Sequence, residues 1–181
     1  MRYNCLMGIL ELGTTLLSLS ALIFLAAIFG IILYAMAFGA PYAALAQNRI
    51  DTIKELLKLK KGQKMVDLGS GDGRIVIAFA RLGIESHGYE INPVLVMVSR
   101  LKIRRAGLEK KAFIHFKDFW VTNLGDFDGV TLYGIAHIMK RLENKLKKEL
   151  RPGSKIATNY FKFPSLKPIH MRNNVSLYVM D

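Results

Sequence analysis

The residues whose spacing most suggests chemistry are three glycines that follow an acid. The stretch DLGSGDG places Gly69, Gly71 and Gly73 just after Asp67. A dinucleotide fingerprint would be Gly-x-Gly-x-x-Gly, with a helix N-terminus facing the pyrophosphate. Here the third glycine comes one residue early, and Asp72 stands where a phosphate would approach. The turn therefore suits a ligand that carries positive charge, and a P-loop is excluded because no Gly-Lys-Ser/Thr follows.

A second acid, Glu90, ends the next predicted strand. In nucleoside-binding doubly wound folds, an acid at this place accepts hydrogen bonds from the ribose hydroxyls. Neighbouring strand ends form one crevice, so the turn and Glu90 should serve one ligand. A sulfonium and an ammonium group without phosphate are the chemistry of S-adenosylmethionine, which we predict as the cofactor. The predicted site also includes Ser70 in the turn and Asn92, which can cap the next helix.

A third acid follows the third predicted strand, in the run Asp118-Phe119-Trp120. Asp118 can accept a hydrogen bond from the adenine amino group while Phe119 packs on the ring. An ordinary loop acid beside a core aromatic residue has the same pattern.

The sequence does not identify a general base. Tyr133 and Tyr160 end the fourth and fifth predicted strands, and His137 follows shortly after the fourth. A packing role is favoured for the two tyrosines, and the role of His137 is ambiguous. We therefore assign no catalytic residue, and we expect no metal.

The elements that position these residues alternate between strand and helix, which predicts an α/β fold with a doubly wound, mostly parallel sheet. The predicted strands are 64–68, 86–90, 112–117, 129–133, 155–159 and an antiparallel 175–180. Helices are predicted over 49–59, 74–82, from Pro93 to just before Gly107, and up to about Leu150. The connection 118–128 is too short for a full crossover helix.

A long apolar segment precedes this domain. No charged residue lies between Glu11 and Arg49, and the 23 residues from Leu16 to Phe38 are almost wholly apolar. At about 1.5 Å per residue they make a helix of roughly 34 Å, against a hydrocarbon core of about 30 Å. We predict a transmembrane helix at about 14–38, an anchor over 1–46 and a methyltransferase domain over 47–181. A signal peptide, whose apolar region is shorter, and a buried core helix are the alternatives.

The net positive charge is confined to the part that follows this segment. The chain has 26 Lys and Arg against 14 Asp and Glu, a net charge of +12, and residues 1–48 sum to zero. The positive-inside rule then predicts a single-pass protein with its domain in the cytoplasm. The single Cys5 permits no intramolecular disulfide, which suits a reducing compartment. The basic surface is compatible with solvated helix faces, an anionic membrane or nucleic acid, and the charge alone does not favour nucleic acid.

These motifs resemble those of the class I (seven-strand) methyltransferases. More narrowly, the chain resembles the membrane-anchored protein-lysine methyltransferases that modify the ATP synthase c subunit and the adenine nucleotide translocase. The resemblance rests on GAPY after the apolar segment, VDLGSGDGRIVI, GYEINPVLV, KDFW and NYFKFP. It departs after Pro41-Tyr42, where Ala43-Ala44-Leu45 replaces a Val-Pro-Thr-like stretch.

The resemblance implies a methyltransferase that acts on protein lysines. By position, Asp67 and the glycines would line the methionine end of the cofactor, Glu90 the ribose, and Asp118 with Phe119 the adenine. No Asn/Asp-Pro-Pro-Tyr stretch follows the fourth strand, which argues against methylation of adenine, cytosine or glutamine amino groups. Other RNA targets, a lipid, a small molecule, or a non-catalytic module that holds nucleic acid or anionic lipid remain as alternatives.

Overall fold

The computed structural model describes residues 2–38 and 46–181, with side chains described for 11–31 and 46–181. The chain divides into two compact units, residues 1–39 and 40–181, and each is considered by itself. The GAPY stretch and the departure at 43–45 lie outside the described residues.

The first unit is a single helix, α1 (Arg2–Phe38), which begins earlier than the predicted residue 14. Its segment Glu11–Ile31 has a mean hydropathy of 2.2 and no buried residue. The hydroxyls of Thr15 and Ser18 donate to carbonyls one turn earlier, as do those of Thr14 and Ser20. Such bonds leave these hydroxyl donors satisfied without water, as an apolar surrounding requires. By length and composition α1 is able to cross a membrane, although a signal sequence would meet the same criteria.

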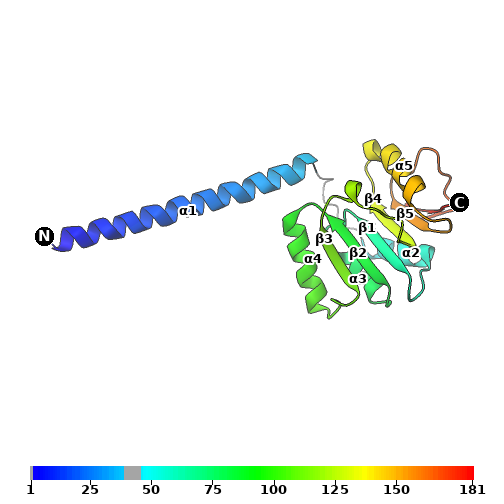
Figure 1. Ribbon diagram of the computed structural model, residues 1–181, viewed down its shortest axis with the longest axis horizontal. Helices are drawn as coiled ribbons and strands as arrows, with labels where there is room; N and C mark the ends of the chain where they lie inside the picture. The colour runs from blue at the N-terminus through cyan, green and yellow to red at the C-terminus, as the bar shows by residue number, and fades with distance from the viewer. Residues whose placement is uncertain (1, 39–45) are drawn as a thin grey trace. The chain divides into compact units, whose positions relative to one another are not determined.

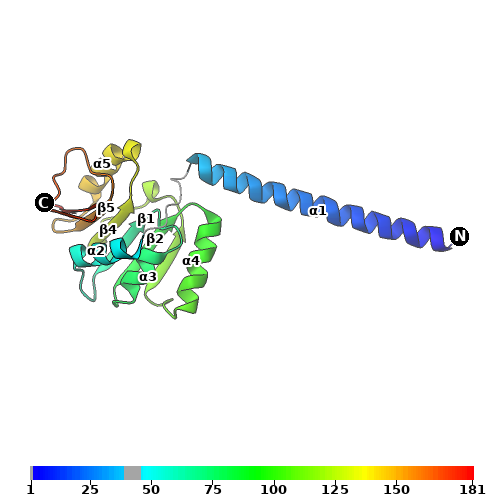
Figure 2. The same ribbon diagram turned by 180° about the vertical axis from the view of Figure 1, so that it is seen from behind.

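The second unit is a seven-stranded sheet with the order β3-β2-β1-β4-β5-β7-β6 (Figures 1 and 2). The strands are β1 (Lys64–Leu68), β2 (Glu85–Glu90), β3 (Ala112–Phe116), β4 (Gly129–Tyr133), β5 (Lys155–Asn159), β6 (His170–Arg172) and β7 (Val175–Val179). The first five are parallel, and β7 runs antiparallel to both of its neighbours. The predicted doubly wound α/β fold is confirmed.

The helices are α2 (Gln47–Leu57), α3 (Arg74–Ala80), α4 (Pro93–Arg105) and α5 (Met139–Glu149), with short 3₁₀ helices η1 (Phe119–Val121) and η2 (Ala136–Ile138). The connection between β3 and β4 contains the short helix η1 and no full helix, as predicted from the small number of residues in that connection. Strand β6 is not foreseen from sequence, because its three residues are all exposed and show no apolar alternation. It forms because Asn173 and Asn174 both adopt positive φ (51° and 61°) and fold the chain back onto β7.

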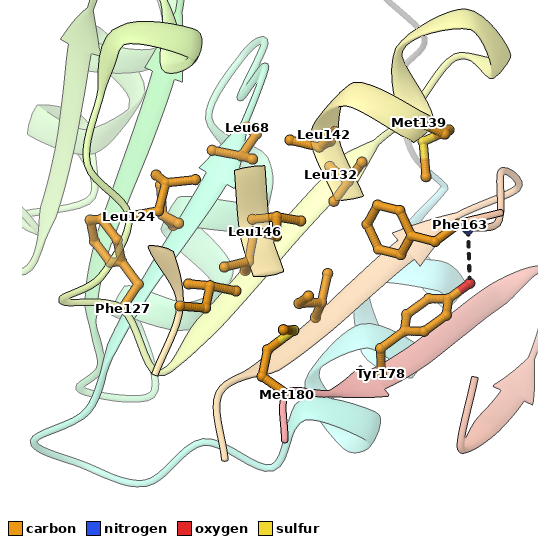
Figure 3. Close-up of a cluster of buried hydrophobic side chains, with 14 of the residues drawn as sticks. Leu68, Leu124, Phe127, Leu132, Met139, Leu142, Leu146, Phe163, Tyr178 and Met180 are labelled. Carbon is orange, nitrogen blue, oxygen red and sulfur yellow. Dashed lines mark hydrogen bonds between the residues drawn. The ribbon is translucent and has the colours of Figure 1, made fainter. Parts of the chain in front are cut away.

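Alternate side chains of the central strands enter different cores on the two faces of the sheet. Figure 3 shows the larger core, in which Leu142 and Leu146 of α5 lie over Leu132 of β4. At its edge the amide of Phe163 donates to the hydroxyl of Tyr178 over 3.3 Å. The opposite face is covered by α2, α3 and α4, which contribute to two further clusters. The apolar alternation of the strands thus determines which face each side chain takes.

The strand order reverses direction between β1 and β4. Ligands of doubly wound folds bind outside the carboxyl ends of the strands at such a switch point. Leu68 of β1 pairs with Tyr89 of β2 on one side and with Leu132 of β4 on the other. The glycine turn therefore begins at the switch point of the sheet.

Gly73 should be the glycine least tolerant of substitution in the turn. Its φ is +76°, and an added Cβ would lie 2.8 Å from Cβ of Ser99 on α4. We expect Gly73→Ala to lower the free energy of unfolding by about 2–4 kcal/mol, because backbone strain and overpacking both act there. Urea unfolding followed by circular dichroism measures the loss.

Gly107 provides a matched control for this variant. It also has a positive φ (+63°), but an added Cβ would meet nothing within 4 Å. Gly107→Ala should therefore cost only the backbone strain, about 1–2 kcal/mol. Equal losses in the two variants would contradict the close approach of α4 to the turn.

Candidate cofactor site

Glu90 joins the glycine turn to the end of β2. Its Oε2 accepts a hydrogen bond from the amide of Gly71 over 2.8 Å. Its Oε1 accepts from the amides of Ile91 and Asn92 over 2.9 and 2.8 Å. A carboxylate offers about four acceptor positions, so about one remains free, on Oε2. Accepting both ribose hydroxyls, as predicted, would require one of the backbone bonds to be shared or released.

The turn itself wraps around the end of β2. The amides of Gly69 and Ser70 both donate to the carbonyl of Tyr89, over 2.9 and 3.0 Å. The Ser70 side chain packs so closely on β2 that a Cβ at Gly88 would lie 2.6 Å from it. Gly88 is thus required by the turn, a role that sequence reasoning missed although the residue lies within the GYEINPVLV motif.

Asp67 lies beneath the turn and is 3% exposed. Its Oδ1 accepts a hydrogen bond from the hydroxyl of Thr131 on β4 over 2.7 Å. Burial raises the pKa of Asp67 to about 7; the Thr131 hydrogen bond acts in the opposite direction, and the charges of Glu90 and Asp72 add to the rise. A cationic ligand group placed near this carboxyl would stabilise its charged form.

The expectation that Asp72 presents an uncompensated acidic charge to the ligand is wrong. Its carboxylate is 5% exposed and pairs with Arg74 and with Lys102 of α4. Burial alone would raise the pKa of Asp72, but hydrogen bonds from these two cations hold it well below its usual range. Asp72 therefore links α4 to the turn, and the negative charge available to a ligand comes from Glu90 and ionised Asp67.

The remaining predicted residues lie at the strand ends in capping positions. Asn92 Oδ1 accepts from the amides of Val94 and Leu95 at the start of α4, so only its amide group is left for a ligand. Asp118 is exposed and caps η1, because its carboxylate accepts from the amide of Trp120, the second residue of that helix. The pairing of Glu90 with Phe116 of β3 places Asn92 and Asp118 at the edge that holds Glu90. Their contact with the cofactor stays a prediction.

Phe119 is half-buried beside Trp120, with ring centroids 4.8 Å apart. It also packs against the larger core, which agrees with the alternative of a core aromatic residue.

The three candidate bases do not all lie together. His137 is exposed on η2, whereas the rings of Tyr133 and Tyr160 contact each other.

The site has the groups that S-adenosylmethionine requires. A Cβ at Gly69 would meet nothing within 4 Å, so open space lies beside the backbone of the turn. The buried hydroxyl oxygen of Ser70 has no hydrogen-bond partner among the described residues. Two buried carboxyls face this turn, and none of the described residues groups three or more His, Cys, Asp or Glu for a metal. The arrangement fits a cationic nucleoside, and the two cations beside the turn, Arg74 and Lys102, are paired with Asp72.

The fold is that of a known class of enzyme. A solved RNA methyltransferase from Salinibacter ruber, in complex with S-adenosyl-L-homocysteine, matches with a TM-score of 0.71. The two chains are 27% identical, over 76% of this chain and 92% of that one. The fold is that of the class I S-adenosylmethionine-dependent methyltransferases, as predicted.

The chain belongs to the ANTKMT methyltransferase domain family, whose profile matches residues 67–170. The lysine N-methyltransferase of the ATP synthase c subunit from Mus musculus is 36% identical over 130 residues, which cover 72% of this chain and 52% of that protein. A protein-lysine N-methyltransferase of Saccharolobus islandicus is 27% identical over 150 residues, 77% of this chain and 93% of that one. The predicted family is confirmed, although the match spans only about half of the mouse relative.

Proposed function

We propose that this protein transfers the methyl group of S-adenosylmethionine to lysine side chains of a protein in or at a membrane. The observation that carries the proposal is the bond between Glu90 and Gly71, which assembles the turn and the acid of β2 into one nucleoside site. When bound, the cofactor supplies a methyl group on a positively charged sulfur. The chain then has to orient a neutral amine and exclude water.

Lysine as the acceptor is supported by the family and by its two relatives, both named for lysine methylation. An amine must lose a proton before it can attack, so the acceptor site needs a path to water or a base. The exposed edge of Tyr160, which is 48% accessible, provides such a path at the end of β5.

The membrane setting is supported by α1 and by the charge distribution. An apolar helix followed by a domain with a net charge of +12 suits a single-pass anchor with the domain in the cytoplasm. Basic residues close to an anionic leaflet each contribute about 1 kcal/mol of attraction. A tethered enzyme reaches acceptors at the same membrane more readily than free metabolites.

RNA is the second candidate acceptor. It is favoured by the basic domain and by the name of the Salinibacter ruber structure. Many basic side chains here are already engaged, however, such as Lys102 with Asp72 and Lys145 with Glu149.

The identity of the acceptor is tested by finding which molecule receives a radioactive methyl group. Full-length protein in detergent is incubated with methyl-tritiated S-adenosylmethionine and a solubilised membrane extract that contains both protein and RNA. We expect label in methylated lysine after acid hydrolysis of the protein fraction. Label confined to RNA or lipid would overturn the lysine assignment, and an absence of both transfer and cofactor binding would overturn the enzyme.

A further inference from the structure

Asn159, the last residue of β5, is a buried polar side chain that the described structure leaves without a partner. It is 1% exposed, and neither its carboxamide oxygen nor its nitrogen has a hydrogen-bond partner among the described residues. A carboxamide can donate two hydrogen bonds and accept two, and burying one without partners is costly. Native proteins retain such groups rarely, which suggests that a ligand supplies the missing partner.

The next residue, Tyr160, has a strained backbone that orients its ring. Its φ is +65°, a region that a bulky residue seldom adopts. The strain is held by two bonds, from the Tyr160 amide to Asn174 O (2.8 Å) and from the Phe161 amide to Asn159 O (2.9 Å). The ring then meets that of Tyr133 edge-on, with centroids 5.9 Å apart. Two tyrosine rings thus lie at the strand end that carries the unpartnered Asn159.

The ring of Tyr160 already receives a cation. The guanidinium carbon of Arg49, from α2, lies 4.6 Å from its centroid. Because Arg49 already takes this cation position, an aliphatic amine would place its methylene chain, not its charge, against the rings. The carboxamide, in turn, accepts an N–H from either an amine or an ammonium. Together these groups select an aliphatic amine.

This cluster lies next to the candidate cofactor site. Asn159 pairs with Tyr133 of β4, and the preceding residue of β4, Leu132, pairs with Leu68, which leads into the glycine turn. With neighbouring strands about 4.8 Å apart, Asn159 lies about 10 Å across the sheet from the end of β1. Asn159 thus lies two strands from the turn, at the same carboxyl edge of the sheet.

We infer that Asn159, Tyr160 and Tyr133 form the subsite that binds the acceptor lysine. The inference rests on the function proposed above and adds the place of the acceptor to it. The rings contact the methylene chain, and the Asn159 carbonyl oxygen accepts one N–H of the neutral amine. The ammonium first gives its proton to water; its lone pair then forms the N–C bond as the S–C bond of the donor breaks, and the methylated amine carries the positive charge. Asn159 positions the amine and takes no proton.

The main test is Asn159→Leu, which removes both polar atoms at nearly constant volume. We expect its melting temperature to rise, because no unpartnered polar group stays buried. Affinity for S-adenosylhomocysteine by calorimetry should stay within about 2-fold, whereas methyl transfer to lysine falls by at least about 10-fold. An asparagine with a purely structural role would instead lower the melting temperature. Unchanged transfer would overturn the subsite.

Three further variants separate the chemical roles of Tyr160 and Asn159. Tyr160→Phe keeps the ring face and should retain transfer, whereas Tyr160→Leu should raise the apparent KM for acceptor about 3- to 30-fold. Asn159→Asp places a carboxylate beside the amine, so the pH at which transfer is half-maximal should rise by about one unit. Equal transfer by the Phe and Leu variants, or an unshifted pH profile, would contradict the assignment.

The outcomes also separate this inference from the proposed function. Wild-type protein that labels only RNA or lipid contradicts the lysine function itself. Wild-type protein that labels lysine, with Asn159→Leu labelling it equally, leaves that function intact and contradicts only the subsite.

Discussion

Glu90→Gln is expected to weaken the binding of S-adenosylhomocysteine by at least about 100-fold and to remove methyl transfer. Both oxygens of Glu90 accept backbone N–H groups, from Gly71 on one side and from Ile91 and Asn92 on the other. The amide of glutamine must therefore point its NH₂ group at a backbone donor on one side. The turn then loses a charge-assisted hydrogen bond worth about 1.5–3 kcal/mol, and the ribose loses an ionised acceptor.

Calorimetric titration of full-length protein in detergent measures the affinity. Glu109→Gln is the matched control, because Glu109 is exposed beyond the end of α4 and makes the same change of charge far from the turn. Its affinity should equal that of the wild type. Retention of wild-type affinity by Glu90→Gln would show that the nucleoside does not bind at this strand end.

Asp67→Asn is expected to separate stability from cofactor binding. Burial raises the pKa of Asp67 to about 7, so the folded protein holds a proton that the unfolded chain releases near its ordinary value of 3.8. Between these values the folded state binds more protons, and the free energy of unfolding falls as the pH rises, by at most about 1.4 kcal/mol per pH unit. Above about pH 7 Asp67 is ionised in the folded state too, so the free energy of unfolding no longer falls on its account. Asparagine stays neutral, so this contribution disappears and the cofactor-free variant should be more stable than the wild type at pH 8.

Cofactor affinity should show the opposite trend. The cationic methionine end is attracted by ionised Asp67, so wild-type affinity should rise between pH 6 and pH 8, whereas the Asp67→Asn variant binds weakly and without that rise. Urea unfolding and calorimetry at matched pH values measure both quantities. Histidines also titrate in this range, but they contribute equally to both proteins. Their contribution therefore cancels in the difference between the wild-type and variant values.

Thr131→Val provides a control in the opposite direction. It deletes the hydroxyl that donates to Asp67 over 2.7 Å, so the pKa of Asp67 should rise further and the fall in stability should extend to higher pH. A wild-type unfolding free energy with no Asp67-dependent change between pH 5 and pH 8 would contradict the raised pKa.

Local chemistry made part of the site predictable. The three glycines of the turn all have positive φ angles, 76° at Gly69, 55° at Gly71 and 76° at Gly73. Residues with a side chain adopt such angles at a cost, so glycines at this spacing indicate a turn. Glu90 could be placed with the turn because β1 and β2 are parallel neighbours that end together. Asn92 could be recognised as a cap from its position before Pro93. The conclusions about the glycines and Asn92 depend on local contacts, and the one about Glu90 depends on the pairing of two successive strands.

Other features depend on residues far apart in the sequence. Asp72 is acidic in type, but Lys102 from α4, 30 residues later, neutralises it. Thr131 reaches Asp67 across 64 residues. Neither pairing leaves a periodic pattern in the sequence. A single polar residue in a strand, or one lysine on a basic helix, is compatible with many roles.

The sequence by itself determined the alternation of strands and helices, the cofactor class, the family and the apolar character of α1, because these depend on local spacing and on hydrophobic period. Only the tertiary structure decided which charges remain for a ligand, why Gly88 has no side chain, and that Asn159 is buried without a partner among the described residues. The physical reason is that pKa, close packing and hydrogen-bond satisfaction are properties of surroundings, and those are assembled from several strands at once.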